Sequence, residues 1–277
     1  MIVGALELGG SHVSVARVDL ERAAVEGALR LPLDPAGSRA DLLAPILDAA
    51  RSTANGVTRV GVAAPGPFDY ANGICTIEGV GKLEGLFGVD LRLELSQVFD
   101  EASPEAIVFL NDAEAFLLGE AWAGTARGHA RVIGITLGTG LGSAFLAEGQ
   151  IVRDGPGVPP EGNLHLASFR GRPVEETISG PAICARFDGA TAVQQIAAQA
   201  DRGDPLALGM LAQVGDDLAE FLAPWCADFG TSLVVVGGSI ARAWRHFGAV
   251  LTHAPVDIVV ATRLDDAALL GAARYAA

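Results

Sequence analysis

Three glycine-containing turns, each following an apolar run, are the first groups in this sequence whose spacing could do chemistry. They are LELGGSH (residues 6–12), TLGTGLGS (136–143) and VVVGGSI (234–240). Because glycine has no Cβ, successive backbone N–H groups in such a turn can surround a phosphate. A glycine after a strand is more often a plain turn, but three such turns favour phosphate binding. None has the GxxxxGK(S/T) pattern or opens a GxGxxG helix, so a different phosphate-binding fold is expected.

A candidate acid–base group stands in LNDAEA (residues 110–115), where Asp112 follows an apolar run and precedes a predicted helix. A carboxylate near a helix start in a closing cleft can orient a hydroxyl and remove its proton, which contributes about 10²- to 10⁴-fold to a rate. The alternative is an N-cap aspartate that only satisfies helix N–H groups. The residues alone leave both interpretations open.

A polar loop, PPEGNLHLASFRGRPVEETISG (residues 159–180), collects side chains that can bind polyols or metals. Glu161, Asn163 and His165 precede a short basic turn, and Glu175 follows it. The loop contains no cysteine. A ligand role and a plain surface loop are both compatible with this composition.

The elements that must position these groups follow an α/β pattern. Residues 2–19 predict a β-hairpin with a Gly9-Gly10 turn, and residues 131–152 predict a second hairpin of the same design. Two such hairpins, roughly 130 residues apart, indicate an internal duplication with one lobe per copy. The pattern predicts two lobes with mixed β-sheets flanked by helices, and a ligand site in the cleft between them. The remaining predicted elements are, in order, a helix at 40–54, a strand at 59–66, a glycine-rich irregular stretch through 88, a strand at 106–112, helices from 113 and at 182–187, 192–201 and 205–229, a strand at 232–240 followed by a helix, a strand at 257–262 and a helix at 266–276.

Composition limits the function further. The 277 residues are half hydrophobic, which suffices for a substantial core. With 33 acidic and 19 basic side chains the net charge is −14, so neither nucleic acid nor membrane is an expected partner. Cys75, Cys184 and Cys226 form no CxxC pair and are expected to be buried core residues in a reducing compartment. No apolar run reaches the roughly 18 residues of a membrane span and the start is not basic, so a cytoplasmic protein is expected.

The order of motifs carries a family resemblance. Between residues 2 and 273 the chain has LELGGSHV, GVAAPGPFD, FLNDAEAFLLGEA, GITLGTGLGSAFLAEGQI, EETISGPAI, VVVGGSI and AALLGAA, and it resembles the sugar kinases of the ROK family (repressor, open reading frame, kinase) within the actin-like ATPase superfold. The resemblance implies a smaller lobe of residues 1–113 and 265–277 and a larger lobe of residues 114–264. It also implies a homodimer and an ATP-dependent kinase that phosphorylates the primary 6-hydroxyl of a hexose or amino-hexose.

The same resemblance implies a role for each motif. Asp112 would take the proton from the attacking sugar hydroxyl, and Asn111 and Gly66 would bind the sugar. Mg²⁺ would bridge the ATP phosphates with few protein ligands. The nucleotide-binding residues would be Gly9, Gly10, Ser11, Gly138, Thr139 and Gly140 around the phosphates, and Gly237, Gly238 and Ser239 on the adenosine side.

The chain departs from the family pattern in the polar loop. Many relatives carry a cysteine-rich loop that holds a structural Zn²⁺ with the help of the histidine. In this chain the sequence runs from His165 through RGRPV without a cysteine, so no zinc site is expected. His165 and Glu175 are then expected to bind sugar hydroxyls, at about 1.5 to 3 kcal/mol for a charge-assisted bond. The family's other sugar-binding glutamate falls at Gly162, so either Glu161 or Asn163 replaces it, and Glu161 is favoured.

Two further departures concern charged side chains. Glu7 stands where the family has aspartate, and its longer side chain weakens the expected contact with Mg²⁺. Within residues 73–91, relatives that act on glucose commonly have an Asn-Leu-Pro stretch and a tryptophan, whereas this chain has Glu78, Gly79, Val80 and Lys82. Glu78 could pair with the ammonium group of an amino sugar. A solvated loop without a ligand role is at least as well supported.

Other functions fit parts of the sequence. A ROK-type sugar-responsive repressor would carry a helix-turn-helix ahead of the first glycine turn, but the first predicted strand begins at Ile2 and the charge disfavours DNA. A sugar-binding protein without kinase activity conflicts with the presence of Asp112 and GTGLG. Polyphosphate could replace ATP at the same amides, although 19 cations supply no evident basic channel. The apolar stretch 218–230 is expected to be a core helix rather than a dimer interface.

Overall fold

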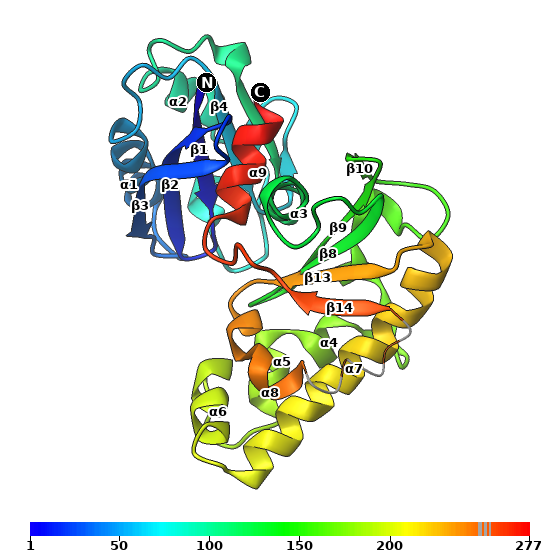
Figure 1. Cartoon of the computed structure of the whole chain (residues 1–277). Coiled ribbons are helices and arrows are strands. Elements are labelled where there is room, and N and C mark those ends of the chain that lie inside the picture. The colour runs from blue at the N-terminus through cyan, green and yellow to red at the C-terminus, as the bar shows by residue number, and fades with distance from the viewer. Residues whose placement is uncertain (249–250, 252–253, 255) are drawn as a thin grey trace. The chain divides into compact units, whose positions relative to one another are not determined.

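The computed structural model describes residues 1–248, 251, 254 and 256–277. The chain divides into two compact units (Figure 1): unit 1 comprises Met1–Ala123 and Asp265–Ala277, and unit 2 comprises Gly124–Leu264. We expected the first division at residue 113, which lies inside helix α3 (Asp112–Ala123). This helix belongs to unit 1, where it packs along helix α9 (Ala267–Tyr275).

Unit 1 is built on a five-stranded mixed sheet with the strand order β3-β2-β1-β4-β7. The predicted hairpin of β1 and β2 forms its antiparallel part together with β3, and β4 and β7 extend the sheet in parallel with β1. The apolar runs of β1, β2 and β4 are buried almost throughout, because helices cover both faces of the sheet. The strands are β1 (Ile2–Leu8), β2 (His12–Asp19), β3 (Ala24–Pro32), β4 (Val60–Ala64) and β7 (Ile107–Asn111).

The helices of unit 1 hold the start of α3 in a fixed place. On one face of the sheet, α1 (Arg39–Arg51) buries Leu42 and Ile46 in the core. On the other face, the backbone of α9 lies directly against β4 and α3. A Cβ on Gly61 of β4 would lie 1.9 Å from the carbonyl oxygen of Ala272 in α9, and a Cβ on Gly271 of α9 would lie 1.7 Å from that of Ala115 in α3. Glycine is therefore required where these elements cross.

Between β4 and β7, the stretch predicted as irregular through residue 88 contains short elements. Buried side chains of Ile77, Leu83 and Leu86 anchor it to the core of unit 1. Up to residue 88 the elements are β5 (Phe68–Asp69), β6 (Ile74–Cys75) and η1 (Glu84–Leu86), and α2 (Leu91–Ser96) and η2 (Pro104–Ala106) follow before β7.

Unit 2 repeats the strand plan of unit 1. Its sheet has the order β10-β9-β8-β13-β14, with three antiparallel strands followed by two parallel ones. This agreement between the two sheets supports the internal duplication, and the α/β fold with two mixed sheets flanked by helices is confirmed. The strands are β8 (Arg131–Leu137), β9 (Leu141–Ala147), β10 (Gln150–Val152), β13 (Leu233–Gly237) and β14 (Asp257–Val260), with a small hairpin of β11 (Ser168–Phe169) and β12 (Arg172–Pro173).

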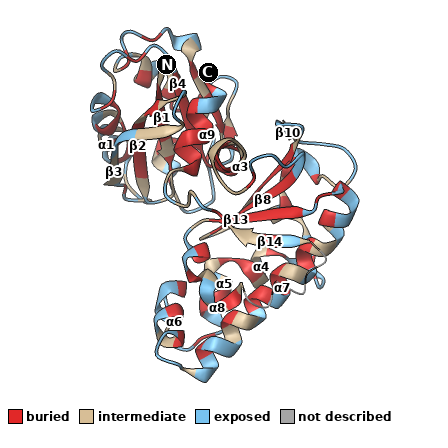
Figure 2. Cartoon of the chain, in the orientation of Figure 1, coloured by how far each residue is buried: buried red, intermediate tan, exposed pale blue. Residues whose placement is uncertain are grey.

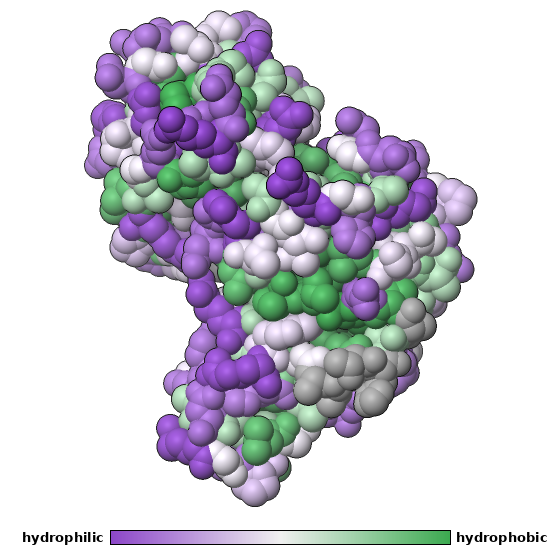
Figure 3. Space-filling view, in the orientation of Figure 1, coloured by the Kyte–Doolittle hydropathy of each residue, from purple (hydrophilic) through white to green (hydrophobic). Residues whose placement is uncertain are grey.

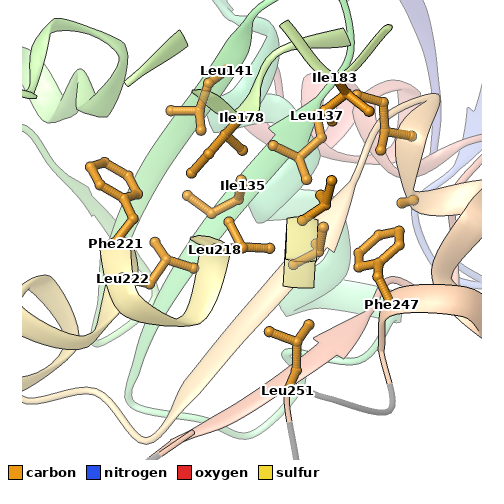
Figure 4. Close-up of a cluster of buried hydrophobic side chains, with 14 of the residues drawn as sticks. Ile135, Leu137, Leu141, Ile178, Ile183, Leu218, Phe221, Leu222, Phe247 and Leu251 are labelled. Atoms are coloured by element: carbon orange, nitrogen blue, oxygen red, sulfur yellow. The ribbon is translucent and has the colours of Figure 1, made fainter. Parts of the chain in front are cut away.

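The core of unit 2 lies between this sheet and helix α7 (Pro205–Phe229), which has its predicted bounds. Figure 4 shows Ile135 and Leu137 of β8 with Leu218 and Phe221 of α7 in this cluster. The apolar side chains of 218–230 are mostly buried here, as expected for a core helix. The other helices are η3 (Pro160–Gly162), η4 (Leu164–Leu166), α4 (Glu175–Ile178), α5 (Gly180–Ala185), α6 (Val193–Ala200), η5 (Ile240–Ala243) and α8 (Trp244–Phe247).

Burial follows the layers of each unit. Buried residues fill the central strands and the inner sides of the helices, and exposed ones lie on the edge strand β3, the outer helix sides and the loops (Figure 2). On the face of unit 2 in view, hydrophobic residues gather over β13 and β14 (Figure 3), where Val259 and Val260 are partly exposed. All three cysteines are buried and unpaired, as predicted. In the described part of the chain, no helix combines the length and apolar character needed to cross a bilayer.

Candidate active site

The parallel strands of unit 1 end at one edge of the sheet, and three predicted site segments follow those ends. The Gly9–Ser11 turn follows β1, Gly66 follows β4, and Asn111 and Asp112 lie at the junction of β7 and α3. Carboxyl ends of neighbouring parallel strands lie together, and ligands commonly bind in α/β proteins at such edges. The fold therefore brings these segments of unit 1 to one place.

Asn111, and not Asp112, caps helix α3. Asn111 Oδ1 accepts hydrogen bonds from the N–H groups of Ala113 (2.9 Å) and Glu114 (3.3 Å). Asn111 Nδ2 donates to the hydroxyl of Tyr70 at 3.1 Å. The Asp112 carboxylate accepts a bond from the Ala113 N–H at 2.8 Å. The capping role that was the alternative for Asp112 therefore belongs mainly to Asn111.

The surroundings of Asp112 make it a stronger base than an exposed aspartate. Burial raises the pKa of Asp112 above its ordinary value, while the Ala113 N–H and the charge of Lys82 lower it less strongly. A carboxylate with a raised pKa binds a proton more readily near neutral pH, as general base catalysis requires. The start of helix α3 still favours its ionised form.

Glu7 provides a second carboxylate on β1. Its pKa is raised to about 7, first by burial and then by the negative charge of Asp112, against the smaller effects of Arg30 and Ser14. Glu7 therefore takes up a proton near neutral pH. This protonation limits the negative charge beside Asp112.

Two side chains close over the Gly9–Gly10 turn. A Cβ on Gly9 would lie 2.2 Å from Cε1 of His12, and a Cβ on Gly10 would lie 3.1 Å from Cδ and 3.9 Å from Nζ of Lys82. Burial, followed by the charge of Arg30, lowers the pKa of His12 to about 4, so this imidazole is neutral at physiological pH. Lys82 thus brings a positive charge to a turn that sequence reasoning had assigned to backbone amides alone.

The sugar-side residues predicted in unit 1 are only partly brought together. The Tyr70 hydroxyl lies 3.6 Å from the Cβ position of Gly66 and donates to the Ala64 carbonyl at 3.2 Å. Since Tyr70 also contacts Asn111, it connects Gly66 with Asn111. Sequence reasoning missed Tyr70, which lies in no recognised motif. Glu78 is exposed on the loop after β6.

In unit 2, the polar loop is tied to the glycine turn after β8. Glu175 Oε1 accepts a hydrogen bond from the Leu141 N–H at 2.7 Å and would lie 2.5 Å from a Cβ on Gly140. The Gly180 N–H donates to the Gly138 carbonyl at 2.8 Å. Thr139 is exposed at the tip of the turn. The carboxylate predicted to bind sugar therefore also fixes the predicted phosphate turn.

The turn after β13 packs against the same region. Gly238 has φ +84°, and a Cβ there would lie 2.3 Å from the Leu137 carbonyl oxygen, so only glycine fits. Ser239 Oγ lies 3.6 Å from the Cβ position of Gly138. The Gly138–Gly140 and Gly237–Ser239 turns, predicted separately, are thus neighbours within unit 2.

An open pocket of about 210 Å³ lies beside Ser239. Gln194 Nε2 donates to the Ser239 carbonyl at 3.3 Å, which joins α6 to the turn. Sequence reasoning found only Ser239 among the lining residues, since they come from α6, η5 and α8 and have no shared spacing. The pocket is lined by Val193, Gln194, Ala197, Ala198, Asp201, Ser239, Arg242, Ala243 and Arg245.

Ser143 of β9 holds the first half of the polar loop. Its hydroxyl donates to the Gly162 carbonyl at 2.6 Å and accepts from the Leu164 N–H at 2.9 Å. These two bonds fix the backbone on both sides of Asn163. Asn163 and His165 are partly buried, whereas Glu161 is exposed with φ +55°.

Ion pairs link the second half of the loop to α7. Asp217 is 2% exposed and lies between Arg170 of the β11–β12 hairpin (2.8 Å) and Arg186 (2.9 Å). Arg170 Nε also donates to Glu220 Oε1 at 3.1 Å. In residues 1–248, 251, 254 and 256–277, no three His, Cys, Asp or Glu side chains form a group suited to a metal ion.

Two mixed sheets with the same strand order, each with glycine-containing turns after two of its parallel strands, define a protein of the actin-like ATPase fold. The chain belongs to the ROK family, whose model matches residues 3–277. It is 28% identical over 309 residues to the glucokinase of Thermotoga maritima, covering 97% of this chain and 95% of that protein. It is 31% identical over 166 residues to the N-acetyl-D-glucosamine kinase of Pectobacterium atrosepticum, covering 58% of this chain and 52% of that protein. The ROK family glucokinase from Streptomyces griseus, solved in complex with glucose and AMPPNP, matches with a TM-score of 0.77 at 22% identity over 99% of both chains.

Proposed function

We propose that this protein is an ATP-dependent sugar kinase that phosphorylates the 6-hydroxyl of a hexose or amino-hexose, with Asp112 as general base. The observation that carries the proposal is the carboxylate of Asp112, which lies next to the helix cap Asn111 and which burial makes more basic. It stands at the same strand edge as the Gly9–Ser11 turn. The family membership and the kinase relatives agree with this chemistry.

The residues of each unit have separate tasks in this mechanism. Asp112 orients the sugar hydroxyl and accepts its proton as the oxygen attacks the γ-phosphorus. Backbone amides of Gly9, Gly10 and Ser11 in unit 1, and of Gly138, Thr139 and Gly140 in unit 2, bind phosphate oxygens. Gly237, Gly238 and Ser239, with the pocket beside Ser239, accommodate the adenosine. These contacts mainly position the substrates and stabilise developing charge, which is most of what phosphoryl transfer requires.

Mg²⁺ is the expected cofactor because it neutralises the phosphate charge and shields it from the acidic chain. The carboxylates at the strand edge of unit 1 are hard oxygen donors suited to this ion. We propose Glu7 as the protein side chain that would contact this ion; because its pKa is raised to about 7, such a contact would include release of its proton. We propose that ATP phosphates supply most of the ligands.

We propose Asn111 and Gly66 of unit 1 as sugar-binding residues. In unit 2 we propose His165, Glu175 and either Asn163 or Glu161 for the same role. The two hydrogen bonds of Ser143 favour Asn163 over Glu161. They fix the backbone on both sides of Asn163, whereas Glu161 is exposed. Glu175 can bind a sugar hydroxyl through Oε2 while Oε1 holds the Leu141 N–H. Glu78, which is exposed, is the residue proposed to select an amino group.

A panel of sugars tests the function. Purified protein with ATP and Mg²⁺ is incubated with glucose, glucosamine, N-acetylglucosamine and other hexoses, and sugar phosphates are identified by mass spectrometry and phosphorus NMR. We expect 6-phosphorylation of at least one of them, and polyphosphate in place of ATP serves as a donor control. Failure to phosphorylate any sugar with either donor would rule out the kinase assignment.

The preference for an amino sugar is tested with Glu78→Gln. If Glu78 pairs with the sugar ammonium group, this variant raises KM for glucosamine about 10-fold and leaves KM for glucose unchanged. A wild-type preference for neutral glucose would remove the amino-sugar hypothesis. The homodimer and the cytoplasmic location stay predictions, and light scattering checks the former.

A further inference from the structure

Lys82 is the only lysine in the chain, because the other 18 of its 19 basic side chains are arginine. Sequence reasoning regarded it as a residue of a solvated loop. In the structure it is partly buried, and its side chain lies over the Gly9–Gly10 turn, with Nζ 3.9 Å from the Cβ position of Gly10. Its charge also acts on Asp112. One ammonium group therefore lies over the predicted phosphate turn and acts electrostatically on the proposed base.

The loop that carries Lys82 is built to hold it in this position. Gly79 and Gly81 both have φ +71°, and the next residue after Lys82, Leu83, also takes a left-handed conformation at φ +57°. Leu83 is 1% exposed, and its N–H donates to the Pro35 carbonyl at 2.8 Å. The Gly81 N–H donates to Glu84 Oε1 at 2.7 Å. A left-handed leucine costs free energy, so the surrounding contacts must impose this backbone path.

A lysine suits this place chemically. With a net charge of −14, the protein repels polyanions, and backbone amides supply only partial charges to a phosphate. A lysine ammonium is a compact charge with three donors on a flexible stem, which can follow a phosphoryl group as it moves. In phosphoryl transfer, stabilising the charge on the transferred group is a main source of rate enhancement.

We propose that Lys82 is a further catalytic residue, whose ammonium group binds the phosphoryl group in transit between ATP and the sugar. This proposal rests on the proposed kinase function. The sugar oxygen forms a bond to the γ-phosphorus and gives its proton to Asp112, while the bond from phosphorus to the bridging oxygen breaks and its electron pair leaves with ADP. Lys82 donates hydrogen bonds to the oxygens of the transferred group throughout and neither gains nor loses a proton.

Steady-state kinetics of Lys82→Gln and Lys82→Arg test the role. Lys82→Gln is expected to lower kcat about 10²- to 10³-fold, the cost of removing one preorganised charged donor. Lys82→Arg keeps the charge and is expected to retain activity within about 10-fold. Because Lys82 lowers the pKa of Asp112, the acid limb of the kcat/KM profile should move to higher pH in the glutamine variant only. Arg22→Gln removes an equal charge from an exposed position of unit 1 and should change neither quantity.

Chemical labelling gives a second test that needs no turnover. An amine-selective acetylating reagent can modify only Lys82 and the Met1 amine, so intact mass and peptide analysis report Lys82 directly. Mg²⁺ with AMPPNP is expected to slow acetylation of Lys82 at least 10-fold and to leave Met1 unaffected. Equal rates with and without AMPPNP would overturn the proposal.

The outcomes separate this proposal from the function. If the wild-type protein phosphorylates a sugar and Lys82→Gln, shown to be folded by circular dichroism, has an unchanged kcat, only the role of Lys82 is wrong. If the wild-type protein has no kinase activity, the proposed function is wrong. If AMPPNP protected Lys82 from acetylation in such an inactive protein, Lys82 would still be assigned to nucleotide phosphate binding. Without protection, this binding role would be wrong as well.

Discussion

Replacement of Glu7 by glutamine should stabilise unit 1, and the gain should grow with pH. The pKa of Glu7 is raised from 4.5 to about 7, so the stability linked to its protonated form is complete below pH 4.5 and is lost as the pH rises through 7. Between pH 5 and pH 8 the loss is about 2.5 kcal/mol at about 1.36 kcal/mol per pKa unit. Glu7 keeps part of its surface in water, which screens its charge, so we expect a gain of about 1 to 2.5 kcal/mol for Glu7→Gln.

Urea unfolding of the wild type and Glu7→Gln at pH 5, 6, 7 and 8 measures this gain. Hydrogen-exchange labelling of peptides from β1 and β2 reports unit 1 alone, because both strands lie in its sheet. Glu26→Gln on the exposed edge strand β3 removes the same charge without burial and should show no pH-dependent gain. An equal gain for Glu7→Gln at pH 5 and pH 8, or the same gain in Glu26→Gln, would refute the electrostatic account of Glu7.

Three further predictions concern unit 2. Asp217→Asn should destabilise it by about 3 kcal/mol, because two arginines lose a buried partner. Asp216→Asn on the exposed side of α7 should cost less than about 0.5 kcal/mol. The midpoints of urea unfolding of the two variants and the wild type measure this difference. Gly238→Ala should weaken AMPPNP binding at least 10-fold by calorimetry, since its Cβ would collide with Leu137, and unchanged affinity would contradict the packing. Glu175→Ala should raise KM for both sugar and ATP, because Glu175 holds the glycine turn. If only KM for the sugar changed, Glu175 would have a role in sugar binding alone.

The elements that carry local signals were predictable from the sequence. The two hairpins, α7 and the Asn-Asp junction of β7 and α3 follow from apolar runs and glycine turns, which act over a few residues. Strand β3 (Ala24–Pro32) was not predicted, because this edge strand is mostly exposed and its residues lack a continuous apolar run. The two mixed sheets were predicted even without β3, because the two similar hairpins indicated an internal duplication.

The parts of the site that depend on tertiary contacts were not predictable. Asn111 and Asp112 are adjacent in sequence, and only the hydrogen bonds show that the first caps the helix. Lys82 lies in a glycine-rich stretch without periodicity, so its approach to Gly10 had no local signal. The pocket beside Ser239 is formed by residues of α6, η5 and α8 that the chain brings together only when folded.

The rate of sugar phosphorylation by Asp112→Asn tests the central claim most directly. The substitution keeps the side-chain shape and removes the base, and Asp100→Asn on the exposed surface of unit 1 is its matched control. With saturating sugar and Mg²⁺-ATP, the account predicts that kcat falls about 10²- to 10⁴-fold in Asp112→Asn and stays unchanged in Asp100→Asn. A folded Asp112→Asn protein that phosphorylates the sugar at the wild-type rate would contradict it.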